Sequence, residues 1–200
     1  FWPSMLKSAG IRLPTKICVH GFVTINGLKM SKSRGTFILA RDYLDNLDPD
    51  FLRYYYACKL SNSAEDLDLN LEDFVQKINS DLVGKVVNLA SRCSKFITKG
   101  NDGYLHSEID DKELWNIFSQ SATTISENYE NRNFSKATRE ILKLTDLANE
   151  YISDKQPWVL NKEHDNKEQV LILSSLGINL LRLIMIYLKQ ITPNLVRKAE

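Results

Sequence analysis

The sequence predicts a mainly α-helical protein, in which a small N-terminal part with one strand precedes an antiparallel bundle of long helices. Three observations support this fold class. Apolar residues recur at helical spacing from about residue 71 onward, a β-branched and aromatic run precedes Asn26, and short loops separate the helical stretches. Hydrophobic residues make up 43% of the 200 residues, which is enough for a sizeable core.

The first 35 residues predict a short helix, a strand and a loop. Residues 1–10 have the pattern of a helical turn region. Lys16 to Ile25 predicts a strand, and Gly21 inside it indicates a bulge or a close backbone approach. Asn26-Gly27 predicts a turn, and the polar stretch after it predicts a loop that Gly27 and Gly35 bracket as hinges.

The N-terminal stretch is basic, although the net charge of the whole chain is only +1. It contains no Asp or Glu before Asp42. Such a block suits the phosphates of a nucleotide or of RNA, whereas the plainer alternative is a solvated surface with acidic neighbours from elsewhere in the fold. The seven positive residues are Lys7, Arg12, Lys16, Lys29, Lys32, Arg34 and Arg41.

Residues 40–70 predict short helices followed by a linker. Asp48-Pro49-Asp50 is a turn and N-cap signal for the helix that follows it. The three tyrosines at 54–56 point in three directions on a helix, so at least one belongs to the core and none is assigned to a site. The polar and acidic segment from Ser61 to Asn70 is predicted to be a linker.

Four long apolar patterns predict the bundle. Val170 to Tyr187 is the most apolar, but Arg182 at its middle would cost about 2.5–3.5 kcal/mol in a bilayer, so we predict a central bundle helix and no membrane span. Pro157 and Pro193 mark helix boundaries. The other three stripes are Phe74, Ile78, Leu82, Val86, Leu89, Cys93 and Ile97; Leu114, Phe118, Ala122, Ile125 and Tyr129; and Phe134, Ala137, Ile141, Leu144, Ala148 and Ile152.

The cysteines and the chain start indicate a piece of an intracellular protein. Cys18, Cys58 and Cys93 show no C-x-x-C spacing, so we expect no disulfide framework and no metal site, and each cysteine as a small buried hydrophobe. A reducing compartment fits, and we predict a cytoplasmic location. The chain opens at Phe1, without Met and inside an apolar pattern, as expected of a fragment of a longer protein.

The predicted loop carries the motif Lys29-Met30-Ser31-Lys32-Ser33, followed by Arg34-Gly35-Thr36. This motif resembles the second signature of the class I aminoacyl-tRNA synthetases, and its context agrees, with a strand before it and a helical domain after it. The first signature of that class, His-x-Gly-His, does not occur in the sequence. The resemblance therefore implies that this chain alone is inactive.

The resemblance implies a role for each loop residue in activating an amino acid with ATP. Negative charge builds on the α-phosphate and on departing pyrophosphate, and an ammonium group aimed there stabilises the transition state. Lys32 is expected to be the catalytic residue and main ATP contact, with Lys29 as the second cation. Ser31 and Ser33 would bind phosphates or hold the loop closed, and Met30 would anchor it. Glycine-flanked loops of this kind open and close around substrate.

The cofactors expected from the resemblance are ATP and Mg²⁺. Zinc is expected only in an insertion that many members of the class carry and that this chain lacks. His20, just before the loop, could hydrogen-bond a ribose or a phosphate, and a structural histidine at a strand end is an equal alternative.

Several further motifs resemble the methionyl-tRNA synthetase family. They are His20-Gly21-Phe22-Val23-Thr24-Ile25-Asn26-Gly27, Leu52-Arg53-Tyr54-Tyr55-Tyr56, Asp68-Leu69-Asn70-Leu71-Glu72-Asp73-Phe74, Val86-Val87-Asn88-Leu89-Ala90-Ser91-Arg92 and Pro157-Trp158. By this resemblance Asn88, Arg92 and Trp158 read the CAU anticodon of tRNA(Met).

The residues themselves agree with an RNA-binding surface. Asn88 and Arg92 lie one turn apart on a helix, and Lys85, Lys95 and Lys99 share their face, opposite the apolar stripe. Trp158 after Pro157 could offer a ring for stacking on an unpaired base. The alternatives are a merely solvated basic face and a tryptophan that belongs to the core.

The resemblance implies three parts. Residues 1–37 would be the end of a Rossmann-type catalytic domain with the signature loop, 38–73 a connecting domain that contacts the tRNA stem, and 74–200 an α-helical anticodon-binding domain. The implied function is part of a methionine–tRNA ligase. The alternative is a non-catalytic tRNA-binding module, against which the complete loop argues; a His-x-Gly-His sequence upstream of Phe1 would decide.

Overall fold

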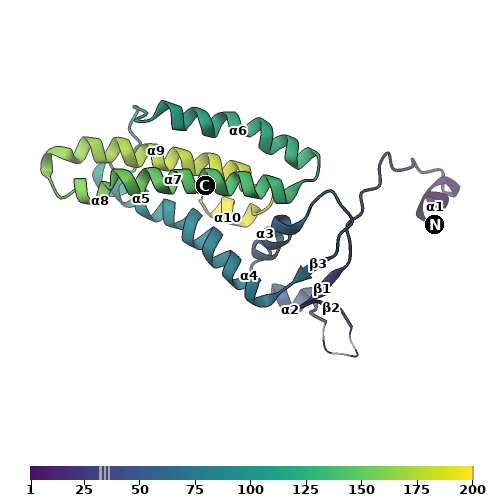
Figure 1. Cartoon of the computed structure of the whole chain (residues 1–200). Helices are drawn as coiled ribbons and strands as arrows, with labels where there is room; N and C mark the ends of the chain where they lie inside the picture. Colours follow the sequence, from purple (N-terminus) through teal and green to yellow (C-terminus); the bar gives the residue numbers. More distant parts are fainter. Residues whose placement is uncertain (32, 34, 36, 200) are drawn as a thin grey trace.

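The computed structural model describes residues 1–31, 33, 35 and 37–199, and the side chain of His164 is not described. Figure 1 shows a helical bundle, a small sheet beside it, and an N-terminal arm that extends away from both. The chain is thus mainly helical with a small sheet, which confirms the predicted fold class.

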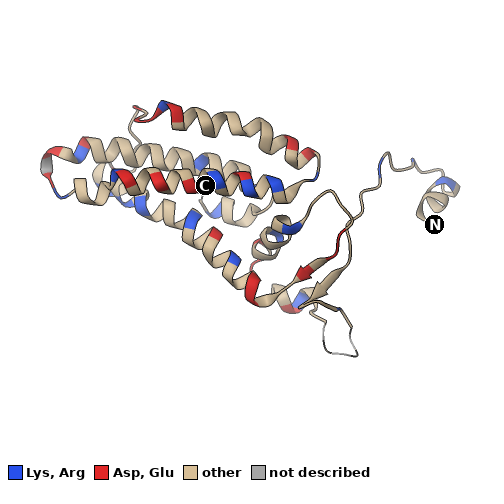
Figure 2. Cartoon of the chain, in the orientation of Figure 1, with Lys and Arg blue, Asp and Glu red and all other residues tan. Residues whose placement is uncertain are grey.

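The arm begins with a short helix and leads into the sheet. Helix α1 spans Trp2–Ser8 and has no buried residue. Gly10 follows it with φ +69°, as the predicted end of a helical turn region requires. Figure 2 shows that α1 and the arm carry Lys and Arg but no acidic residue.

The strands that the structure describes form one sheet in the order β2-β1-β3. β1 (Val23–Ile25) pairs antiparallel with β2 (Leu28–Lys29) through the turn at Asn26 and Gly27, whose φ angles are 49° and 74°. Such positive φ values at both central residues are the reason for the Asn-Gly preference in tight hairpins. β1 also pairs parallel with β3 (Leu67–Leu69), so that Thr24 lies opposite Asp68.

The predicted strand from Lys16 to Ile25 is too long, because only Val23–Ile25 forms one. The partner strand β3 has only three residues. Gly21 and Phe22 still bond to the backbone of Glu65 and Leu67, whereas residues 16–20, all within the described part of the chain, have no backbone hydrogen bond to another segment. The prediction for Gly21 is confirmed as a close backbone approach: its N–H donates to the Glu65 carbonyl at 3.2 Å, and a Cβ there would lie 2.5 Å from the Asp66 nitrogen. The predicted linker Ser61–Asn70 was wrong where it contains β3.

Two helices connect the loop to the bundle. α2 spans Ala40–Leu44 and α3 spans Pro49–Lys59. Asp48 caps α3 by accepting the Asp50 N–H at 3.0 Å, as predicted. Within α3, Tyr54 and Tyr55 are fully buried, so the tyrosines do belong largely to the core.

The longest helical path runs through α4 (Leu71–Lys77), a π-helical segment η1 (Ile78–Val87) and α5 (Asn88–Gly100). π-helical turns are rare and the sequence pattern did not predict this one. The predicted apolar stripe is confirmed, because all its members are buried: Phe74, Ile78, Leu82, Val86, Leu89, Cys93 and Ile97.

Four further helices complete the bundle and a fifth closes it. They are α6 (Lys112–Glu130), α7 (Phe134–Lys155), α8 (Pro157–Leu160), α9 (Lys167–Leu188) and α10 (Pro193–Ala199), with a short 3₁₀ turn η2 (His164–Asn166) before α9. Figure 1 shows α5, α6 and α7 around α9, and all three contact it. Pro193 begins α10 and so lies beyond the end of α9.

α9 is the core helix of the bundle. By length and composition it could cross a membrane, but 67% of its apolar window is buried inside the structure. Gly177 lets it approach α5 and α7 closely, since a Cβ there would lie 2.5 Å from the sulfur of Cys93 and 3.0 Å from Ile152.

Two details of the predicted core were wrong. Ala122 on α6 is exposed, whereas the other members of its stripe are buried or half-buried. Of the three free cysteines, Cys93 is buried, Cys58 is half-buried and Cys18 is exposed on the arm. Burial raises the pKa of the Cys93 thiol to about 12, so this cysteine stays protonated and packs as an apolar group.

Candidate functional site

The signature motif lies in a loop that leaves the sheet at β2. Lys29 ends β2, and its ammonium nitrogen lies 6.0 Å from the centroid of the Phe22 ring. The hydroxyl oxygens of Ser31 and Ser33 lie 3.0 Å apart, and Gly35 has φ +69°. Lys32, the predicted main ATP contact, lies outside the described residues, as do Arg34 and Thr36.

The base of this loop is anchored by apolar packing. Met30 is half-buried and packs against the hydrophobic core. It borders a hollow of about 420 Å³ whose other walls come from α2, α3 and the start of α4, including Tyr43 and Phe74. The loop therefore rests on the helices that connect the sheet to the bundle.

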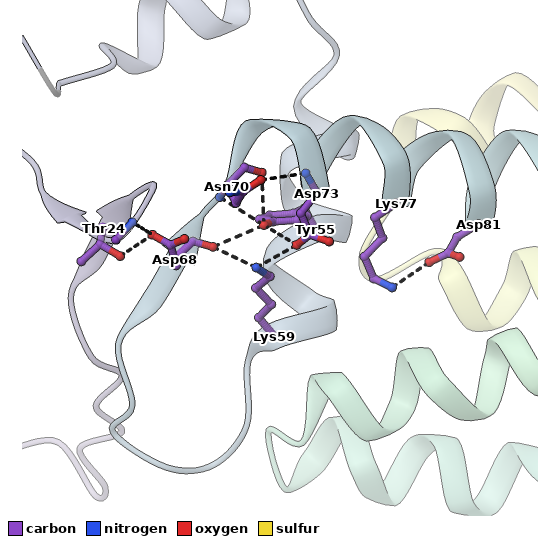
Figure 3. A network of polar contacts seen from close by, with 9 residues as sticks. Thr24, Tyr55, Lys59, Asp68, Asn70, Asp73, Lys77 and Asp81 are labelled. Atoms are coloured by element: carbon purple, nitrogen blue, oxygen red, sulfur yellow. Dashed lines mark hydrogen bonds and ion pairs between the residues drawn. The ribbon is translucent and has the colours of Figure 1, made fainter.

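A polar network holds the hairpin that carries the loop (Figure 3). One carboxylate oxygen of Asp68, on β3, accepts the Thr24 hydroxyl and the Gly27 N–H, each at 2.7 Å. These two hydrogen bonds, that from Thr24 first, hold the pKa of Asp68 below its usual range. Gly27 is the predicted hinge, so Asp68 fixes the hinge of the signature loop.

The same network continues to the start of the long helix. The Asp68 carbonyl accepts the Lys59 ammonium at 3.0 Å, and Lys59 also forms an ion pair with Asp73 at 3.0 Å. The buried Tyr55 donates to Asp73 at 2.8 Å, and Asn70 caps α4 by accepting the Asp73 N–H at 2.9 Å. Burial raises the pKa of Tyr55, so its hydroxyl remains a donor. Sequence reasoning treated this region as a linker and missed the network.

Arg92 of α5 and Trp158 of α8 lie against each other, and Asn88 is on the same helix as Arg92. The Arg92 guanidinium carbon lies 4.6 Å from the centroid of the Trp158 ring. Asn88 lies one helical turn before Arg92, on the exposed side of α5. Trp158 is 39% exposed, so it does not belong to the core and offers part of its ring to solvent. Figure 1 places α8, which contains Trp158, at the end of the bundle away from the sheet and its β1–β2 hairpin.

Two residues of α7 support this cluster and were missed from the sequence. Ser153 accepts from Arg92 at 2.9 Å, and the Asn149 side chain contacts Asn88 at 3.5 Å while donating to the Lys85 carbonyl at 3.1 Å. Asn149 and Ser153 are four residues apart, so they share one face of α7. That half-buried polar pair beside the apolar stripe was the available signal.

The predicted basic ridge is only partly available to a ligand. Lys85 forms an ion pair with Asp146 of α7 at 2.7 Å, so the carboxylate of Asp146 neutralises its positive charge. Lys95 and Lys99 are exposed on the following turns of α5. Among the lysines of the predicted ridge, the two without a carboxylate partner in the described part of the chain, Lys95 and Lys99, therefore lie on the C-terminal half of α5.

The described residues contain no group of three His, Cys, Asp or Glu side chains that could hold a metal ion. Mg²⁺ that accompanies ATP is held largely by phosphate oxygens and waters, so it does not require such a cluster. Lysines and hydroxyls around the loop fit phosphate oxygens, which suits ATP as a substrate.

Two family models match the sequence. The model described as "tRNA synthetases class I (M)" matches residues 1–94. The model described as "Anticodon binding domain of methionyl tRNA ligase" matches residues 104–199. Each site found above thus lies at least partly within a matched range.

Solved structures of one bacterial enzyme are similar along the whole chain. Mycobacterium tuberculosis methionyl-tRNA synthetase in complex with methionyl-adenylate has a TM-score of 0.84 and 28% identity, covering 98% of this chain and 40% of that one. A second structure bound by methionyl-adenylate has a TM-score of 0.83 and 28% identity with the same coverage. The apo form has 0.80 and 25%, covering 98% and 39%. This chain spans about two fifths of the length of these proteins.

Proposed function

Because this chain belongs to the methionyl-tRNA synthetase family of class I aminoacyl-tRNA synthetases, we propose that it is part of a methionine–tRNA ligase. The full-length protein would activate methionine with ATP and transfer it to tRNA(Met). Support comes from both family models and from similarity to the adenylate-bound structures over 98% of the chain. Since the chain covers 40% of those proteins, we propose the activity for the longer protein. We also propose a cytoplasmic location for it.

We propose three functional parts along the chain. Residues 1–37 would end the catalytic domain, 38–73 would connect it to the bundle, and 74–200 would bind the anticodon. The start of the long helix at Leu71 and the anticodon-domain match over 104–199 support this division. The class I match extends to residue 94, so the long helix would join the last two parts.

The loop Lys29-Met30-Ser31-Lys32-Ser33 would bind the phosphates of ATP. In the reaction the methionine carboxylate attacks the α-phosphate, the bond to the bridging oxygen breaks, and pyrophosphate leaves. Lys32 and Lys29 would stabilise the charge that develops on these oxygens. The hydroxyls of Ser31 and Ser33, 3.0 Å apart, suit a shared phosphate contact. The packing of Met30 supports the role of an anchor during loop closure.

Asn88, Arg92 and Trp158 would read the CAU anticodon. The Watson–Crick edge of cytosine presents two acceptors and one amino donor, and an amide together with a guanidinium offers the complementary groups. The observation that carries the proposal is the Arg92 guanidinium held 4.6 Å from the Trp158 ring by a hydrogen bond to Ser153. This preorganised arrangement offers hydrogen bonding and stacking at one place.

The test is the change Trp158→Ala in the full-length protein. Loss of one stacking ring costs about 1–3 kcal/mol, which is roughly a 5- to 150-fold weaker binding of tRNA with a CAU anticodon. Filter binding or fluorescence anisotropy measures it, with the same tRNA carrying a changed first anticodon base for comparison. Val159→Ala, at a neighbouring position of similar exposure, is the control. Unchanged affinity and discrimination in Trp158→Ala would contradict the anticodon assignment.

A further inference from the structure

A second feature of the bundle end is a hollow of about 460 Å³ beside Trp158. It lies between the C-terminal half of α5, α8 and the start of α9, and Trp158 forms part of its wall. Its volume falls within the range of about 300–1,000 Å³ that is usual for sites of small organic groups. Neither Asn88 nor Arg92 lines it, so the hollow shares only Trp158 with the groups proposed to read the base.

The hollow is positively charged. Lys95, Lys99 and Lys167 line it, and no Asp or Glu is among the lining residues. All three lysines are exposed. Within the described part of the chain none of them has a carboxylate at ion-pair distance, in contrast to Lys85 with Asp146 and Lys77 with Asp81. Three lysines thus line one hollow that has no acidic residue in its wall.

The hollow also has aromatic walls. Phe96 and Trp158 line it, and Asn161 adds an amide. Lysine ammonium groups bind phosphates as point charges, and aromatic rings stack on any base because each base has a π-face. A charged groove with aromatic side chains is the usual arrangement for single-stranded nucleic acid. Lysines alone would suit any anion, but the two rings favour a nucleotide chain.

We propose that this hollow is a backbone subsite for single-stranded RNA. It would bind the phosphates of nucleotides that adjoin the base read by Asn88 and Arg92, and it would contribute affinity without sequence preference. The proposal rests on the anticodon-binding role proposed above, and it assigns Lys95, Lys99 and Lys167 to the RNA backbone.

The subsite has a specific signature in salt dependence. Each phosphate neutralised on a single strand contributes about 0.7 to the slope of log affinity against log salt concentration. Three lysines therefore account for a slope of about 2. At 0.1 M salt the same relation predicts an affinity loss of about 100-fold when all three charges are removed.

The experiment uses the full-length protein that contains this chain, with Lys95→Ala, Lys99→Ala and Lys167→Ala combined. Binding of tRNA with a CAU anticodon is measured from 0.05 to about 0.3 M salt. We expect the slope to fall by about 2 and the ratio of affinities for CAU and a changed anticodon to stay constant. The matched arginine variant, with all three lysines changed to Arg, should recover the slope, which excludes misfolding as the cause.

The control removes three exposed positive charges from the N-terminal half of α7, away from the hollow: Lys136→Ala, Arg139→Ala and Lys143→Ala. It should leave the slope within about 0.5 of the unchanged protein. An unaltered slope in the lysine variant would overturn the subsite, even if Trp158→Ala still lost anticodon discrimination. A lysine variant that lost discrimination instead would show base reading and also overturn it. If Trp158→Ala and the lysine variant were both without effect, the proposed function itself would fail.

Discussion

At the residue scale, Gly21 marks the point where the arm joins the sheet. Its N–H donates to the Glu65 carbonyl, and the space for a side chain is occupied by the backbone of Glu65 and Asp66. Gly21 leads into β1, and Glu65 and Asp66 lead into β3. Their backbone atoms cannot rotate away as a side chain could. The absence of a Cβ is therefore what brings β1 beside β3.

Gly21→Ala should destabilise the protein. A methyl group there would lie 2.5 Å from the Asp66 nitrogen, and overpacking of this kind typically costs about 1–3 kcal/mol. Thermal unfolding followed by circular dichroism measures the change. Gly100→Ala, at a helical glycine with open space around its Cβ position, should be neutral or slightly stabilising. Equal stability of the two variants would show that the arm does not need the close approach.

At the element scale, one residue, Asp68, connects a hairpin to a helix. Asp68 on β3 holds the β1–β2 turn through its side chain and holds Lys59 of α3 through its carbonyl. Lys59 and Tyr55 then reach Asp73 in the first turn of α4 (Figure 3). The hinge of the signature loop and the first turn of α4 therefore share one set of hydrogen bonds.

Asp68→Ala should loosen the hinge. The Thr24 hydroxyl and the Gly27 N–H would lose their acceptor, and because both are partly solvated we expect about 1–2 kcal/mol of destabilisation. In the full-length protein, adenylate formation measured by pyrophosphate exchange should slow while tRNA affinity is kept. Asp68→Asn, which keeps the acceptor oxygen, should retain most of the rate, and the exposed Asp45→Ala is the control. Equal rates for Asp68→Ala and Asp45→Ala would argue against this positioning role.

The pH dependence of the network follows from the same contacts. The folded-state pKa of Asp68 is lowered, first by the Thr24 hydroxyl and then by the Gly27 N–H. Its contribution to stability is thus fully present above its unfolded pKa of about 3.9 and is lost as the pH falls through the lower folded value. The lowered pKa of Asp73, which Tyr55 and Lys59 cause, adds in the same direction.

At the scale of the whole molecule, the β1–β2 hairpin and α8 lie far apart, and one continuous helical path through α4, η1 and α5 runs from beside the hairpin into the bundle (Figure 1). The helix carries Asn88 and Arg92, and its first turn joins the network below the signature loop. This arrangement sets the spacing between the hairpin of the signature loop, proposed to bind phosphates, and the bundle, proposed to bind RNA. One tRNA could therefore contact both ends of the full-length protein.

The isolated chain should bind RNA but not activate methionine. It contains the lysine–serine loop without the His-x-Gly-His signature, so much of the site that would orient ATP and methionine is absent from this sequence. Mixed with ATP, methionine and labelled pyrophosphate, it should give no exchange into ATP, whereas the full-length protein serves as the positive control. Exchange by the folded chain would contradict the view that these residues supply only part of the active site.

Local features of this protein were predictable from the sequence. The 3.6-residue period of the buried stripes, the Asn26-Gly27 turn, the Asp48 cap and the shared face of Asn88 and Arg92 all depend on contacts within a few residues. These contacts follow from backbone geometry alone. The mainly helical fold and the resemblance of the loop motif therefore follow from the sequence.

Contacts between distant segments were decided only by the tertiary structure. Arg92 meets Trp158 across more than sixty residues, Lys85 is neutralised by Asp146 on α7, and Thr24 lies opposite Asp68 in a strand that the polar pattern concealed. Such pairings depend on how helices cross and which strands find partners, and no sequence period encodes either. The helices and the signature motif of the loop follow from the amino-acid sequence. Packing between helices determines that Lys85 is paired with Asp146 and that the Trp158 ring lies beside Arg92.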